Sequence, residues 1–184
     1  MHGGAVEMEM EIDETIWRNY FEVGQTAYRS DCWPVAERMH RAALAEALRG
    51  VSADRQALSS YSLALVLLRQ GRVAEAQKLL RKSVRLYSRL DSLNLTVVSS
   101  VLADTYWHEG AAEKAIPLLK FAMRLVLRRD GAASPHLLPV LKRMVLIYTE
   151  KKIYPQSDKY FRRLLEIQYR AGLMSFSRGA SCDS

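Results

Sequence analysis

Apolar residues recur every three to four positions along most of the chain, which is the spacing of one face of an α-helix. No stretch alternates apolar and polar residues in the manner of a half-buried β-strand. The linkers of two to five residues are typical of antiparallel helical hairpins. The pattern predicts eight helices, over residues 12–30, 33–49, 53–70, 73–90, 93–109, 112–129, 135–151 and 154–171.

Glycine and proline mark the ends of these segments. Glycine can adopt the left-handed conformation that closes a helix, and five glycines follow a helical stretch: Gly50, Gly71, Gly110, Gly131 and Gly172. Proline is tolerated in a first helical turn, and five prolines lie near the start of a stretch: Pro34, Pro117, Pro135, Pro139 and Pro155. Ser134 followed by Pro135 is the clearest start, a serine cap before a proline.

Small residues recur with a period of about 40 residues in the second helix of each predicted pair. They are Ala36, Ala76, Ala115 and Ser157, spaced 40, 39 and 42 residues apart. Four residues after each stands a larger side chain: His40, Leu80, Leu119 and Phe161. Twelve residues before each stands Gly24, Ala64, Ala103 or Val145. Small residues on facing sides let two antiparallel helices approach closely, and a hairpin that cannot bury its apolar face alone stacks on a neighbour.

This pattern resembles the tetratricopeptide repeat, whose motif has L-G/A-x2-Y in its first helix and A-x3-F in its second. The best match is Leu102, Ala103 and Tyr106 with Ala115 and Leu119, followed by Leu63, Ala64 and Leu67 with Ala76 and Leu80. Weaker matches are Val23, Gly24 and Ala27 with Ala36 and His40, and Met144, Val145 and Tyr148 with Ser157 and Phe161. The long period is similar to the variety found in kinesin light chains and in many bacterial signalling proteins.

The resemblance implies an all-α fold, an α-solenoid of four stacked antiparallel helical hairpins in a right-handed superhelix. The repeats are expected over residues 12–50, 53–91, 92–131 and 134–172, within a repeat domain of residues 12–172. Residues 1–11 are expected to be an acidic, disordered leader, and residues 173–184 a C-terminal tail. The alternative is a non-repetitive helical bundle, which the shared phase of the small residues and turn glycines disfavours.

In the resembled family, the first helix of each repeat lines a concave groove that holds an extended peptide or a partner helix. The groove positions implied here are Arg18, Phe21, Gln25, Tyr28, Arg29, Tyr61, Leu65, Leu68, Arg69, Ser100, Asp104, Trp107, His108, Lys142, Leu146 and Thr149. Aromatic residues mixed with arginine are typical of binding hot spots, although some of these aromatics can instead pack between adjacent repeats.

Two known binding modes of the family are not expected. A clamp for a C-terminal carboxylate needs polar groups where this chain has Leu58, Leu65, Val97 and Val101. A ladder of asparagines along a peptide backbone is excluded because the sequence has only Asn19 and Asn94. The sequence therefore predicts a protein-interaction module or adaptor without naming its partner.

The charge of the chain is unevenly distributed. The net charge is +7, yet residues 1–22 contain six acids and one base. Bases concentrate on the predicted second helices: Lys78, Arg81, Lys82, Arg85, Arg89, Lys120, Arg124, Arg128 and Arg129. A solvated outer face explains them most simply. A regulatory or nucleic-acid-associated protein that uses this basic convex face is the alternative, but stacking on bases needs interleaved aromatics, and Tyr87 is the residue this face offers.

The sequence contains no recognisable catalytic, metal or cofactor site. His2, His40, His108 and His136 lack partners at metal or triad spacing, and Cys32 and Cys182 are expected to be free thiols. No glycine-rich phosphate loop, long apolar run or signal-like start is present in the sequence. We therefore expect a cytoplasmic protein that is not an enzyme, has no cofactor and does not span a membrane.

The last predicted helix has more apolar residues than one packed face can bury. We expect this end to meet another protein surface, most simply a second copy in a homodimer, through Tyr160, Ile167 and Tyr169. In the alternative, residues 173–176 fold back and cap the helix.

Overall fold

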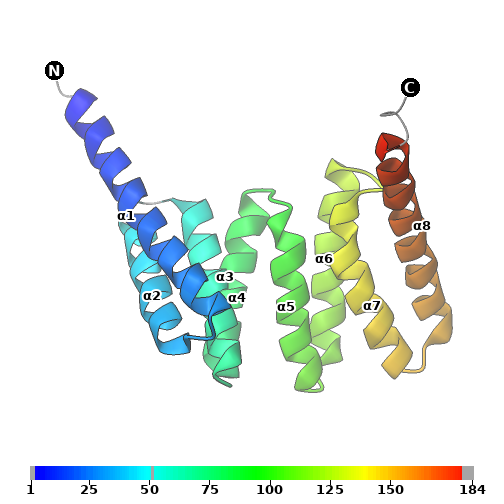
Figure 1. Cartoon of the computed structure of the whole chain (residues 1–184). Coiled ribbons are helices and arrows are strands. Elements are labelled where there is room, and N and C mark those ends of the chain that lie inside the picture. The colour runs from blue at the N-terminus through cyan, green and yellow to red at the C-terminus, as the bar shows by residue number, and fades with distance from the viewer. Residues whose placement is uncertain (1–2, 51, 180–184) are drawn as a thin grey trace. The chain divides into compact units, whose positions relative to one another are not determined.

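The computed structural model describes the backbone of residues 3–50 and 52–179, and the side chains of residues 14–50 and 52–172. All regular structure in these residues is helical (Figure 1). The helices are α1 Gly3–Arg29, α2 Trp33–Arg49, α3 Ala53–Arg69, α4 Val73–Arg89, α5 Asn94–His108, α6 Ala112–Arg129, α7 Leu138–Glu150 and α8 Tyr154–Gly179, with a 3-10 turn, η1, at Pro135–Leu137 before α7. The predicted helices are confirmed, with differences at the two ends.

Both terminal helices are longer than predicted. The α1 helix begins at Gly3 instead of near residue 12, so the backbone of residues 3–11 is helical where a separate disordered leader was expected. Alanine, glutamate and methionine, which fill much of this stretch, are strong helix formers. The α8 helix continues to Gly179, so residues 173–176 extend the helix and do not fold back over it.

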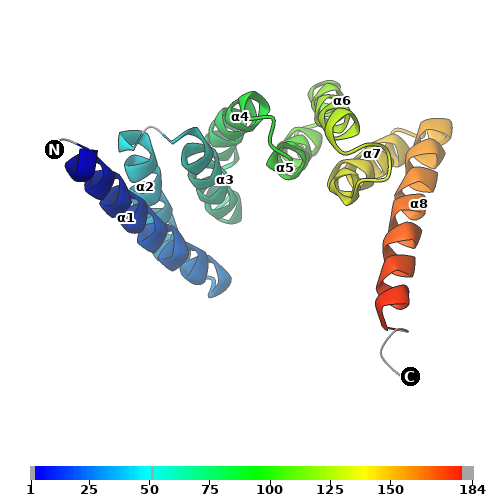
Figure 2. The ribbon, with the colours of Figure 1, turned by 90° about the horizontal axis from the view of Figure 1, so that it is seen from above.

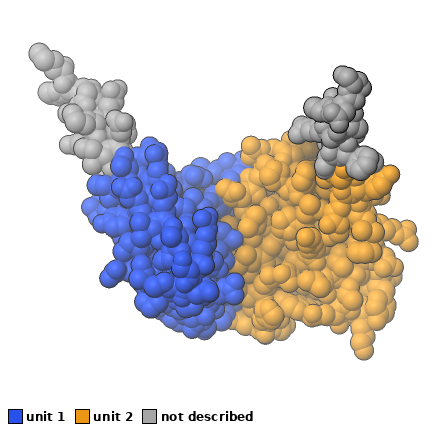
Figure 3. Space-filling model, in the orientation of Figure 1, with its two compact units in different colours: residues 1–92 blue, residues 93–184 orange. Residues whose placement is uncertain are grey.

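The chain divides into two compact units, residues 1–92 and residues 93–184 (Figure 3). In the first unit, consecutive helices pack on one another from α1 to α4, so two antiparallel hairpins lie side by side (Figures 1 and 2). In the second unit, α5 packs on α6 and α7, and α7 packs on α8. The division falls between the second and third predicted repeats, so each unit contains two hairpins.

The four turns within the hairpins share one geometry. Each has a residue with positive φ, namely Asp31 (55°), Gly71 (77°), Gly110 (76°) and Lys152 (57°). The next residue donates its N–H to a carbonyl in the last turn of the first helix: Cys32 to Ala27 (2.9 Å), Arg72 to Leu67 (2.8 Å), Ala111 to Tyr106 (2.8 Å) and Ile153 to Tyr148 (2.9 Å). This bond is a feature of the Schellman helix ending. The turns recur at the spacing of the small residues, which supports the assigned repeat phase.

Three of the five glycines predicted to close helices do so with positive φ. They are Gly71, Gly110 and Gly131, the last with φ of 81°. Gly50 follows α2 as predicted, but at φ of −73° and therefore without the left-handed conformation. The prediction is wrong for Gly172, which lies inside α8. Asp31, Asp91 and Lys152 adopt the left-handed conformation at other helix ends, where the sequence offers no glycine.

The small residues of the repeat lie where helices touch. Ala36, Ala76 and Ala115 have no exposed surface. A Cβ atom added to Gly24 would lie 2.8 Å from the His40 ring, so the glycine makes room for that imidazole. His40 is itself buried.

The position four residues after the small residue is buried in the first three repeats and exposed in the last. Leu80 and Leu119 are fully buried, whereas Phe161 of α8 is 47% exposed. Within the described residues, no further helix packs on that side of α8. The same motif position therefore has a different environment at the end of the array.

Candidate protein-binding surface

The first helices of the two hairpins in residues 1–92 lie against each other. The indole of Trp17 donates to the Ser59 hydroxyl (2.9 Å). The Gln25 amide donates to the Ser62 hydroxyl (3.2 Å), and the Arg69 guanidinium donates to the Tyr28 hydroxyl (3.4 Å). These bonds connect α1 to α3, so the groove residues predicted in the first two repeats form one continuous face, which we call the α1/α3 face.

The α1/α3 face presents arginine around half-buried apolar and aromatic side chains. Arg29 and Arg69 are exposed, and Tyr28 and Tyr61 are half-buried. Burial, followed by the nearby Tyr28, raises the pKa of the Tyr61 hydroxyl. Leu65 and Leu68 are also half-buried on α3. The face therefore offers large amphipathic side chains to a partner.

Two predicted groove residues on α1 are largely used within the unit. Phe21 stacks on Trp17 with centroids 5.1 Å apart, and its ring meets the His40 ring edge-on at 5.5 Å. Arg18 pairs with Glu14 at 2.8 Å, and Glu14 also pairs with Arg55 at 2.9 Å. Phe21 therefore packs between helices, which is the alternative that the sequence left open for its aromatics.

The first helices of residues 93–184 form a second such face, the α5/α7 face. Asp104 of α5 forms a salt bridge with Arg143 of α7, a residue that the sequence did not single out. Burial raises the pKa of Asp104, while the charges of Arg143 and His108 lower it; the net shift is upward. A partner 39 positions away on another helix has no local signal in the sequence.

The predicted groove residues exposed on the α5/α7 face are His108, Lys142, Leu146 and Thr149, and Trp107 is half-buried. Ser100 is wrongly placed by the prediction, because it is buried and its hydroxyl donates to the Thr96 carbonyl (2.8 Å). Thr149 contacts the Ser157 hydroxyl at 2.6 Å, which joins α7 to α8.

The residues predicted for self-association on α8 do not share one environment. Ile167 is 2% exposed and packs in the core with Leu141 and Leu164, so its assignment to an outer surface is wrong. Tyr160 stacks on Tyr148 with centroids 5.6 Å apart. Tyr169 is 68% exposed. Phe161 and Leu165, which precede Tyr169 by eight and four residues, are also exposed. Residues four apart lie on the same side of a helix, so the three side chains form an apolar stripe on α8.

A polar cluster that the sequence did not predict joins the first two hairpins. Glu37 of α2 accepts hydrogen bonds from Arg41 (2.7 Å), Gln70 (2.9 Å) and Arg72 (2.8 Å). Burial raises the pKa of the Glu37 carboxyl, but these hydrogen bonds outweigh it and lower the pKa to about 2. Arg72 also pairs with Glu75 (2.7 Å). The cluster connects α2 to the turn of the next hairpin and is structural.

The described residues offer little for other chemistry. Among them, no group of histidine, cysteine, aspartate and glutamate side chains is placed to hold a metal ion. No helix in the searched part of the chain has the length and apolar character of a membrane span. Cys32 is a free, exposed thiol, and Cys182 and His2 lie outside the described residues.

Comparison with solved structures identifies the fold. The chain is similar to the TPR-like repeats of a kinesin light chain from Podosopora anserina, which are nearly identical to one another. The TM-score is 0.68 and the sequence identity is 15%, over 91% of this chain and 89% of that one. The fold is that of the tetratricopeptide-like repeats. No family model matches the sequence, and no curated protein matches it.

Two further structures share this tetratricopeptide-like fold. BtubC from P. vanneervenii has a TM-score of 0.73 at 17% identity, over 90% of this chain and 74% of that one. MamA has a TM-score of 0.65 at 15% identity, over 90% and 86%. The predicted all-α helical-repeat fold is therefore confirmed, and identities this low show the fold alone.

Proposed function

We propose that this chain is a cytoplasmic protein-interaction module or adaptor, without catalysis, that binds a peptide or helix of a partner along its first helices. The α1/α3 face supports the proposal. Its exposed Arg29 and Arg69 flank the half-buried rings of Tyr28 and Tyr61. A few hot-spot residues provide most of the binding energy of a protein interface, and arginine and tyrosine are enriched among them.

The α5/α7 face of the second unit supports the proposal separately. Trp107 is a half-buried aromatic anchor, and Lys142 and Leu146 are exposed beside it in the next hairpin. The salt bridge between Asp104 and Arg143 connects α5 to α7. It helps to fix the positions of the two helices that carry these side chains.

The experiment begins with affinity capture on the full chain and mass spectrometry to identify the partner. Calorimetry then compares the wild type with the Arg69→Ala, Trp107→Ala double variant. We expect the dissociation constant to rise about tenfold or more, because hot-spot truncations cost about 1.4 kcal/mol or more. Circular dichroism should show unchanged helical content. Equal affinity of the two proteins would place the binding site elsewhere.

Charge reversal of Arg81 and Arg85 on α4 is a second comparison, which tests the alternative of a nucleic-acid-associated protein. Tyr87, the aromatic that the sequence offered for base stacking, is 1% exposed. Phe121 on α6 is 39% exposed among bases. If the Arg81→Glu, Arg85→Glu variant loses binding and the affinity falls steeply with salt, the nucleic-acid alternative is favoured over the groove.

We also propose that α8 takes part in self-association. The apolar stripe of Phe161, Leu165 and Tyr169 supports this, since these side chains are 47%, 47% and 68% exposed. With Ile167 in the core, the residues to test are Leu165 and Tyr169. Sedimentation of the Leu165→Glu, Tyr169→Glu variant at high micromolar concentration should show dissociation if the stripe is an interface, and no change if it is not.

A further inference from the structure

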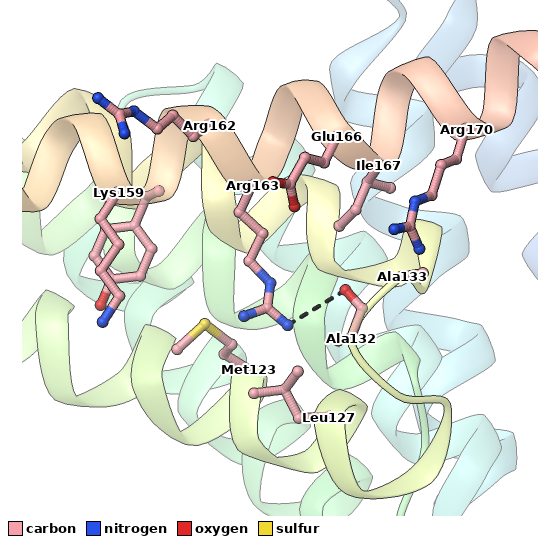
Figure 4. A pocket seen from close by; sticks show the side chains of 11 residues that line it. Met123, Leu127, Ala132, Ala133, Lys159, Arg162, Arg163, Glu166, Ile167 and Arg170 are labelled. Carbon is pink, nitrogen blue, oxygen red and sulfur yellow. Dashed lines mark hydrogen bonds between the residues drawn. The ribbon is translucent and has the colours of Figure 1, made fainter.

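A cleft of about 720 Å³ lies between α6 and α8 in the second unit (Figure 4). The α8 helix contributes one wall, and α6 with the following loop contributes the other. Its lining includes Met123, Leu127, Ala132, Lys159, Arg163 and Arg170. Both walls come from second helices of hairpins, so the cleft is separate from the α1/α3 and α5/α7 faces.

The α8 wall of this cleft is strongly basic. Lys159, Arg162, Arg163 and Arg170 line it together with one acid, Glu166. None of the ion pairs among the described residues involves these four cations. The cleft therefore has a cluster of positive charges that form no salt bridge with the described residues.

Arg163 lies with its charged group inside the cleft. Its Nη2 donates to the Ala132 carbonyl at 3.3 Å (Figure 4). Its Nε is buried without a hydrogen-bond partner. A buried donor left without an acceptor costs free energy, so an acceptor that entered the cleft would find a donor already in place.

The other lining residues make the floor apolar. Met123 and Leu127 of α6 and Ile167 of α8 line it. A small inorganic anion would leave this floor uncovered, because the volume falls in the range of sites that hold much larger ligands. Tyr160 is the aromatic residue of the cleft, and its ring is already stacked on Tyr148, so it is not free to stack on a nucleotide base. The cleft suits a segment that combines carboxylates with apolar side chains.

One segment of this chain has that composition. Residues 7–13 read Glu-Met-Glu-Met-Glu-Ile-Asp, with four acids and three apolar residues. The next acid, Glu14, is already paired with Arg18 and Arg55. We propose that the acidic residues 7–13 of one copy dock into the basic α6/α8 cleft of a second copy, so that the protein associates head to tail.

The dimensions and the topology agree with this docking. Lys159 to Arg170 span about 16 Å of α8, and seven helical residues span about 10 Å, so the segment fits along the basic wall. The segment is in the first unit and the cleft is in the second. Reciprocal exchange of the segment between two copies closes a dimer, whereas one-way docking continues as a chain of copies.

The test is sedimentation of the full chain over a range of concentrations in low salt. One variant reverses the cleft with Arg162→Glu and Arg170→Glu. A second variant reverses the segment with Glu7→Lys and Glu11→Lys. We expect each variant alone to associate about tenfold more weakly than the wild type, and association to return when the two variants are mixed, since each then offers the complement of the other.

The matched control is Lys78→Glu with Arg85→Glu on α4, which makes the same charge change on exposed positions of another second helix. It should associate like the wild type, and circular dichroism should show that all variants keep their helices. Monomers at every concentration would overturn the proposal, as would variants that do not recover on mixing. A loss of association in the control equal to that in the cleft variant would overturn it too. These outcomes leave the proposed adaptor function untouched, because the substituted residues do not belong to the α1/α3 face or to the α5/α7 face.

Discussion

His40, a residue of the repeat motif, makes the stability of the protein depend on pH. Its ring is 1% exposed and neither ring nitrogen has a hydrogen-bond partner. Burial lowers its pKa from 6.5 to about 4. Between these values the unfolded chain binds the proton and the folded chain does not, so the free energy of unfolding falls as the pH falls from about 6.5 to about 4. The total loss is on the order of 3 kcal/mol.

Replacing His40 with leucine, the residue at the equivalent positions Leu80 and Leu119, should remove this dependence. At pH 7 the variant should be more stable by about 1 kcal/mol, because it no longer buries unpaired nitrogens. Urea unfolding at pH 7 and pH 5 measures both effects. Both pH values lie above the ordinary pKa of the Glu37 carboxyl, 4.5, and its lowered value of about 2 in the folded protein, so Glu37 contributes little to the difference. A variant that still loses stability like the wild type would show that other groups cause the pH dependence.

The second prediction at the residue scale concerns stability and the buried alanines of the repeat. Ala76 and Ala115 have no exposed surface and lie where the helices of a hairpin touch. Ala76→Leu or Ala115→Leu should lower the free energy of unfolding by about 1–3 kcal/mol, because the added bulk has no space. Ala74 on the exposed side of α4 is the control, and Ala74→Leu should change the melting temperature little. Unchanged melting in all three variants would contradict the assigned repeat phase.

At the scale of elements, the turns within the hairpins adopt the same conformation with different residues. Gly71 and Gly110 adopt positive φ without strain, whereas Asp31 and Lys152 hold a side chain in the left-handed region. A shared backbone geometry thus recurs even where the residue best suited to it is missing. Packing of the two helices must compensate for the strain at the first and last turns.

Lys152→Gly should therefore raise the free energy of unfolding by about 1 kcal/mol, because the left-handed conformation costs a residue with a side chain about that much relative to glycine. Chemical denaturation of the full chain measures the change. The neighbouring Lys151 has φ of −73°, so Lys151→Gly should not stabilise the protein. If both substitutions have the same effect, the strain at Lys152 is not what limits stability.

At the scale of the whole molecule, acidic residues are concentrated in the first part of α1, and basic and apolar surface on α8. Residues 1–22 contain six acids and one base within a chain of net charge +7. The α8 helix bears both the basic wall of the cleft and the apolar stripe that ends at Tyr169. Such separation of charge favours association between copies at low salt and weakens it when salt screens the charges.

Much of the fold could be predicted from the sequence because its causes are local. Three features act within one hairpin: the helical period of the apolar residues, the turn glycines Gly71 and Gly110, and the positions of Ala76 and Ala115. The eight helices and their pairing follow from these features. Less of the candidate site could be predicted. The exposed Arg69 and the half-buried Tyr28 lie on the predicted face, but the buried Ser100 does not.

Only the tertiary structure decided what depends on neighbours distant in sequence. Leu119 and Phe161 occupy the same motif position, yet one is fully buried and the other is 47% exposed, because no described helix packs on the outer side of α8. The rotation of α8 placed Ile167 in the core and Tyr169 in solvent, although both are apolar residues of one helix. The salt bridge of Asp104 with Arg143, and the cleft where α6 meets α8, arise from helices brought together by packing. The sequence by itself determined the helices and their repeat, since period and turn chemistry are local properties; the surfaces available for binding were decided by packing, since exposure depends on which helices meet.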